Sequence, residues 1–191
     1  MTKLILIRPG TTQFDLEGRI LGTLDVPLSI EGDQEVAQMV EALKQWNVTA
    51  IYTAECQSAL QTAERIATAM DGKAKVVEKL QNVDHGLWQG KLLEEVKRKQ
   101  PKVFKQWREH PETICPPEGE MIGDALARVK TAIAKVLKKN RDGTIALVAP
   151  EPLASLIRSH LLGEDLSQSA SHPSGCGTWD VIDLEPASPA V

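Results

Sequence analysis

The feature that most constrains the fold is a series of short apolar runs separated by longer stretches with helical periodicity. Residues 4–7 read Leu-Ile-Leu-Ile without a polar interruption, which is typical of a strand buried on both faces. The runs at 48–52 and 144–149 have the same character. Between and after them, apolar residues recur at helical spacing over 30–46, 56–70, 118–139 and 151–162. This alternation predicts right-handed crossovers and a three-layer α/β/α sandwich with a mostly parallel central sheet.

The remaining segments complete a single domain over residues 1–185. We expect a short strand at 75–77 and a last strand at 178–184, and Gly163 suits the end of the helix before it. The 191 residues are 42% hydrophobic and 25% charged, which fits one soluble domain with its own core. Residues 186–191, rich in Pro and Ala, are expected to form a loose tail.

The charge and the cysteine content indicate which kinds of partner the chain can bind and in which compartment it works. The net charge is −4 and the pI is about 5.6, so we expect neither nucleic acid nor a membrane as a partner. The first apolar run is too short for a signal peptide. Three cysteines without a C-x-x-C pair indicate reduced thiols in the cytoplasm and no structural zinc. We expect no metal and no cofactor.

Functional side chains of a parallel sheet gather where the strands end. Here these places read Arg8-Pro9-Gly10, Tyr52 to Ser58, and Ala149-Pro150-Glu151. The first of these places lies in a series of motifs along the chain: 6–15 (Leu-Ile-Arg-Pro-Gly-Thr-Thr-Gln-Phe-Asp), 18–28, 61–63 (Gln-Thr-Ala), 86–90 (Gly-Leu-Trp-Gln-Gly), 117–120 (Pro-Glu-Gly-Glu) and 160–163.

In order and spacing these motifs resemble the histidine phosphatase superfamily, on its phosphoglycerate mutase-like branch. The resemblance covers nearly the whole chain and implies that fold, with a lid at about 82–120. It also implies a mechanism in which a histidine of an Arg-His-Gly motif takes the phosphoryl group. Two arginines, a second histidine and an asparagine would hold the phosphate, and a glutamate would donate a proton.

Carried over position by position, the resemblance leaves Arg8 as the one matching functional side chain, a residual phosphate or anion ligand. The nucleophilic histidine falls on Pro9 and the second histidine on Pro150, and a proline ring nitrogen cannot attack phosphorus. The other three positions hold Asp15 for the asparagine, Ser58 for the second arginine and Asn82 for the proton-donating glutamate.

The segment after Pro150 suggests how a phosphate site could be closed. Pro152 offers no N–H but fits a first helical turn, and the Glu151 carboxylate can satisfy the positive helix end itself. We therefore expect a catalytically inactive homologue, a pseudoenzyme that serves as a binding or interaction module. The alternative is an active phosphatase or phosphomutase-like enzyme with relocated catalytic groups around Arg8, such as Cys56 or Asp84.

The other candidate side chains favour structural interpretations. Cys56 is expected in the core, Asp84 and His85 as a solvated loop pair, His160 as a core or edge residue, and His110 and His172 in loops. The basic segment 91–108 is interpreted first as a solvated helical face. A small anion or the acidic face of a protein partner at this lid remains open, as does the oligomeric state.

Overall fold

The computed structural model describes residues 2–165 and 175–184, and the expected tail and His172 lie outside these ranges. Five strands form one sheet in the order β3-β2-β4-β1-β5. They are β1 (Thr2–Ile7), β2 (Val48–Thr53), β3 (Ala74–Val76), β4 (Gly143–Val148) and β5 (Trp179–Leu184).

Four of the five strands run parallel, which confirms the predicted sheet. β1 pairs with β4, β4 with β2, and β2 with β3, all in parallel. β5 pairs with β1 in the antiparallel direction and forms one edge. Residues Leu4 to Ile7 are completely or almost completely buried, because strands lie on both sides of β1 and helices cover the sheet.

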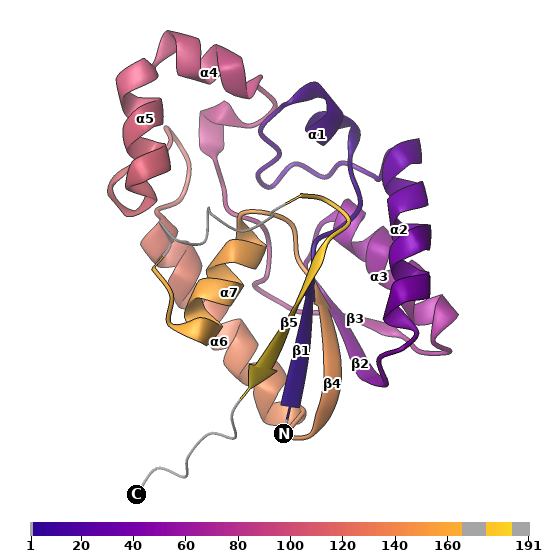
Figure 1. Ribbon diagram of the computed structural model, residues 1–191. Coiled ribbons are helices and arrows are strands. Elements are labelled where there is room, and N and C mark those ends of the chain that lie inside the picture. The colour runs from indigo at the N-terminus through magenta and orange to yellow at the C-terminus, as the bar shows by residue number, and fades with distance from the viewer. Residues whose placement is uncertain (1, 166–174, 185–191) are drawn as a thin grey trace, which may run out of the picture.

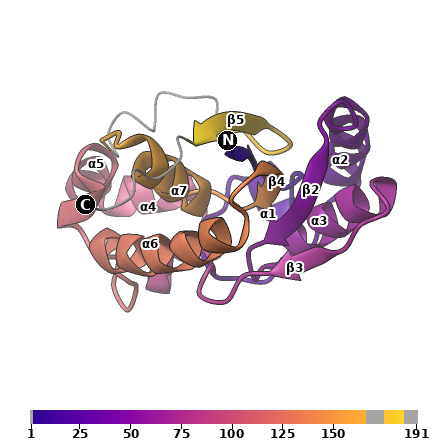
Figure 2. The same cartoon turned by 90° about the horizontal axis from the view of Figure 1, so that it is seen from below.

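Two pairs of helices cover the two faces of the sheet (Figures 1 and 2). Helices α2 (Ile30–Leu43) and α3 (Gln57–Ala69) lie on one face, and α6 (Ile122–Lys139) and α7 (Leu153–Leu162) lie on the other. Their apolar residues join those of the strands in one main core. The architecture is the α/β/α sandwich expected from the sequence.

Two helix starts differ from the expectation. The helix predicted from residue 118 begins at Ile122, because Glu118 has a positive φ of 60°, which a right-handed helix cannot contain. The helix predicted from residue 151 begins at Leu153 after Pro152. Its end is as predicted, since Gly163 has the left-handed conformation that closes many helices.

Residues 82–120 form a separate group of short helices beyond one end of the sheet, at the upper left in Figure 1. They are η1 (Gly86–Trp88), α4 (Leu93–Lys99), α5 (Pro101–Glu109) and η2 (Pro111–Thr113). Their own apolar cluster contains Trp88, Phe104 and Trp107. The short helix α1 (Gln13–Glu17), which the sequence analysis did not anticipate, lies at the same end of the sheet. Among the described helices, none is long and apolar enough to span a membrane.

Candidate active site at the carboxyl ends of β1 and β4

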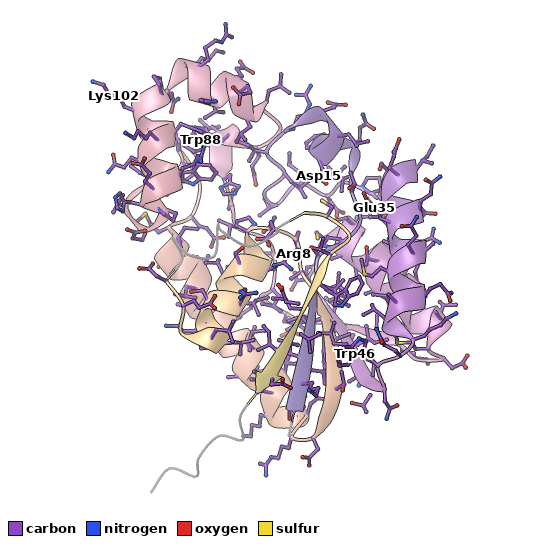
Figure 3. All side chains as sticks on the ribbon, in the orientation of Figure 1. Arg8, Asp15, Glu35, Trp46, Trp88 and Lys102 are labelled. Carbon is purple, nitrogen blue, oxygen red and sulfur yellow. The ribbon has the colours of Figure 1, made fainter. Side chains whose placement is uncertain are left out.

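A cavity of about 400 Å³ opens where β1 and β4 end. Its lining includes Arg8 and Pro9 after β1, and Pro150 and Glu151 after β4. The structure thus brings together the segments that the sequence placed at strand ends. Figure 3 shows Arg8 at this end of the sheet, with Trp88 above it among the short helices.

Arg8 is held by two carboxylates, and we call Arg8, Glu151 and Asp180 the Arg8 clamp. Its Nε donates to Glu151 at 2.8 Å and its Nη1 donates to Asp180 at 2.7 Å. The Arg8 side chain is 3% exposed, against 26% for Glu151 and 22% for Asp180. Burial alone lowers the pKa of Arg8, but the bonds to the two carboxylates outweigh it and raise the pKa. Only Nη2 lacks a protein partner among the described residues.

Glu151 has a second role that the sequence predicted. Its other carboxylate oxygen accepts from the backbone N–H of Ser155 at 3.2 Å and from the Ser155 hydroxyl at 2.6 Å. The carboxylate therefore satisfies the start of α7, where a bound anion would otherwise find free N–H groups.

Four of the five positions at which the chain departs from the family motif line the cavity, and the fifth, Asn82, is buried. Pro9, Asp15, Ser58 and Pro150 line the cavity. The Asp15 carboxylate accepts from the backbone N–H and the hydroxyl of Thr12, in a capping box at α1.

Asn82 is buried behind the cavity and acts as a structural link. Its amide nitrogen donates to the carbonyls of Gly22 at 3.1 Å and Glu151 at 2.9 Å. Its oxygen accepts from the N–H groups of Val83 and Leu153. Asn82 thereby fixes the backbone of Glu151 in place.

His85 corrects one expectation. It was expected in a solvated loop pair with Asp84, yet it is 4% exposed and lines the cavity. Burial lowers its pKa, and the charges of Asp84 and Glu120 only partly oppose this effect. The imidazole is therefore neutral at pH 7. Its Nδ1 is buried without a partner among the described residues.

Two of the quoted motifs hold the turn that carries His85. Gly86 has a positive φ of 49°, and a side chain there would collide with the carbonyl of Pro117. Leu87 donates its N–H to that carbonyl at 2.9 Å, and Glu120 donates to the carbonyl of Asp84 at 3.0 Å. The 86–90 and 117–120 motifs are thus in direct contact and fix the position of His85.

A set of four rings, His85, Trp88, Phe104 and Trp107, forms what we call the aromatic wall. The ring of Trp107 lies 5.6 Å from His85 and 5.5 Å from Trp88, at interplanar angles of 85° and 88°. Such edge-to-face contacts are favoured by the ring quadrupoles. Phe104 and Trp107 share one face of α5 because they are three residues apart.

The cysteines near the cavity are poor nucleophiles. Cys56 is buried in the main core as predicted, and burial raises the pKa of its thiol. Cys176 lines the cavity, but burial and the charge of Asp15 raise its pKa to about 12. Both thiols stay protonated at pH 7, whereas attack on phosphorus requires a thiolate.

The remaining candidates are structural. The Asp84 carboxylate accepts from the N–H of Gly86 at 2.8 Å, His110 lies exposed near Glu112, and His160 sits half-buried in the last turn of α7. In the basic segment, Lys97 and Lys99 pair with glutamates of their own helix. No group of His, Cys, Asp and Glu in the described ranges is arranged to hold a metal ion.

Sequence reasoning missed several residues that line the cavity, among them Arg19, Trp107 and Cys176. Arg19 stands in the quoted 18–28 motif, so its position carried a signal. Its Nη1 donates to the carbonyl of Gly90 at 2.8 Å, which joins that motif to 86–90. No local signal places Trp107 or Cys176, because distant segments bring them to the cavity.

An α/β/α sandwich with a cavity where its parallel strands end is the class of protein that these features define, and comparison with known proteins identifies the family. The model of the histidine phosphatase superfamily (branch 1) matches residues 4–191, and the chain belongs to this superfamily. Phosphoserine phosphatase 1 of Hydrogenobacter thermophilus is 30% identical over 185 residues, covering 97% of this chain and 88% of the relative. A probable phosphoglycerate mutase of Salmonella arizonae is 26% identical, covering 85% and 76%. The solved structure of YhfR from Bacillus stearothermophilus superposes with a TM-score of 0.88 at 25% identity, covering 97% and 92%.

These comparisons contradict the expectation that the chain is an inactive homologue and no enzyme, and we correct it. Two of these similar proteins are named for a phosphatase and a mutase activity. The expectation assumed that chemistry in this fold must use the five motif positions. The cavity also contains His85, which the sequence analysis placed in a solvated loop pair, and Arg19, to which it gave no role.

Proposed function

We propose that this chain is a phosphatase that hydrolyses a small phosphomonoester in the cavity at Arg8. The observation that carries the proposal is the placement of a buried arginine and a neutral histidine, Arg8 and His85, in the lining of one cavity. The family membership and the phosphatase name of a relative support it.

The residues at the motif positions restrict which group can attack phosphorus. Pro9 and Pro150 stand where the resemblance places histidines, so the attacking group comes from elsewhere in the cavity. Arg8 Nη2 and Arg19 supply positive charge for the phosphoryl oxygens. His85 accepts a proton from a water molecule as that water forms the new bond to phosphorus. The bond to the leaving-group oxygen breaks, and the proton passes to that oxygen.

The compartment and partners that we propose are those expected from the charge and the cysteine content. We propose that the protein works in the cytoplasm, which its three free cysteines support. A small anionic substrate is the proposed partner, and neither nucleic acid nor a membrane is.

The test is the pH dependence of kcat/KM for p-nitrophenyl phosphate. Because His85 acts as a base whose pKa is lowered by burial, the activity is expected to be constant near pH 7 and to fall only below about pH 6.5. His85→Gln should lower kcat/KM by roughly 10²-fold or more and remove this acidic limb.

A matched control separates this role from damage to the fold. His160→Gln changes a histidine on α7 whose pKa is also lowered by burial but which does not line the cavity. This variant should leave the rate and the pH profile unchanged. A wild-type protein without turnover, or a His85→Gln variant with the wild-type profile, would overturn the proposal.

A further inference from the structure

The exposed part of Trp107 is the unusual feature of the aromatic wall. Trp88 and Phe104 are 1% and 5% exposed and act as packing. Trp107 is only half-buried, and it lines the cavity. Three neighbouring rings hold its indole in one orientation. A fixed indole with accessible surface toward a cavity is a platform on which a flat ring can stack.

The neighbouring lining of the cavity is also apolar. Ile20, Leu21 and Leu93 line it together with Trp107. Removing such apolar surface from water is favourable, so a ligand that covers it is bound more tightly through the hydrophobic effect. This side of the cavity therefore favours an apolar group of the ligand.

The ionic side of the cavity offers a weak hold on phosphate alone. Arg8 is already paired with Glu151 and Asp180. Arg19, the other cation of the lining, is paired with Glu17. The carboxylates of Asp15 and Glu151 line the same space. Each nearby negative charge opposes a phosphate dianion. A substrate thus depends on its organic part for a large share of its affinity.

From these observations we infer that the preferred substrate is a phosphomonoester whose leaving group carries a flat aromatic ring, and that Trp107 is the residue that selects it. This inference rests on the proposed function for the phosphoryl end and adds the class of the leaving group. Stacking on a fixed indole is expected to contribute roughly 2- to 12-fold in affinity.

The test uses phosphonates, because their carbon–phosphorus bond makes binding independent of turnover. Calorimetry gives Kd for phenylphosphonate and methylphosphonate with the wild type, Trp107→Leu and Trp46→Leu. Trp46 is a matched control because it lies far from Arg8, toward the opposite end of the sheet (Figure 3). We expect phenylphosphonate to bind the wild type and Trp46→Leu several-fold more tightly than methylphosphonate, and Trp107→Leu to bind both about equally.

The other outcomes are equally informative. Equal Kd values for the two phosphonates with the wild type would overturn the inference and leave the proposed function standing. A wild type that binds neither would overturn the inference, and turnover measured separately would still decide the proposed function. If Trp107→Leu does not fold, Trp107→Phe keeps a ring and should retain the preference, and its loss there would contradict stacking. A preference lost also in Trp46→Leu would contradict a specific role of Trp107.

Discussion

Residues of the Arg8 clamp and of the aromatic wall line the same cavity, yet the two groups are held together by different kinds of interaction. In the clamp, the buried charge of Arg8 is met by the carboxylates of Glu151 and Asp180. In the wall, Nδ1 of His85 and Nε1 of Trp88 are buried with no partner in the described part of the chain. Packing of rings stabilises the aromatic wall, whereas ion pairs stabilise the Arg8 clamp. The two sides should therefore respond to different perturbations.

Arg8→Met should have the largest effect on stability. It leaves Glu151 without its cation and Asp180 with Arg158 as its remaining partner at 3.2 Å. The loss of the buried guanidinium that both carboxylates hold should cost about 3 kcal/mol in the free energy of unfolding. Urea denaturation measures this loss. Lys3→Met is the control, because the pair of Lys3 with Asp183 is largely exposed and should contribute less than about 1 kcal/mol. Equal losses in the two variants would show that the clamp is not a stabilising element.

Gly86→Ala should damage the wall without touching the clamp. The positive φ and the carbonyl of Pro117 leave no room for a methyl group, so we expect a loss of about 1–3 kcal/mol. The same change at Gly123, in the first turn of α6 with open space around it, should be neutral or stabilise by up to about 1 kcal/mol. Thermal unfolding distinguishes the two, and a tolerant Gly86 would contradict the tight contact between the 86–90 and 117–120 motifs.

Glu151→Gln should increase the affinity of the cavity for an anion. The amide can still accept a hydrogen bond from Ser155, but it no longer competes as an anion for Arg8. Inorganic phosphate should then bind roughly fivefold more tightly, which corresponds to about 1 kcal/mol. Calorimetric titration gives the Kd, with Glu94→Gln on the exposed face of α4 as the control. An unchanged or weaker Kd would mean that the Glu151 carboxylate does not oppose phosphate.

The burial of His85 in the aromatic wall should make the free energy of unfolding depend on pH, and this effect should be smaller than those of the substitutions above. The pKa of His85 is lower in the folded chain than its ordinary value of about 6.5. Between these two values the unfolded chain binds more protons, so stability is fully present above about pH 6.5 and falls as the pH drops toward the folded pKa. Urea midpoints between pH 7.5 and 5.5 should fall less steeply for His85→Gln than for the wild type. Parallel slopes would contradict the burial of a neutral His85.

The same contrast explains what the sequence could predict. The strands and most helices follow from local patterns such as Leu4 to Ile7, and strand ends place Arg8, Pro9, Pro150 and Glu151 in one region. The helix-capping role of Glu151 was predictable because it depends on residues close in sequence. These parts of the site follow from local order and from the rule that parallel strands end at one edge.

The wall could not be predicted in the same way. His85 lies just before η1 and Trp107 lies in α5, and their contact depends on how residues 82–120 fold together. Asp84 and His85 looked solvated because the sequence does not show that Trp107 covers one of them. The prediction of an inactive homologue was also wrong, because it gave the motif positions more weight than the alternative of relocated groups around Arg8. It also did not place His85 in the cavity.

The most direct test of the account is the release of inorganic phosphate from p-nitrophenyl phosphate by the purified chain, followed past one equivalent per protein molecule. The account predicts multiple turnovers by the wild type and by Lys3→Met, and a rate at least roughly 10²-fold lower for Arg8→Met, measured where that variant is still folded. No release above the blank by the wild type, or the same rate in Arg8→Met, would contradict a phosphatase site at Arg8.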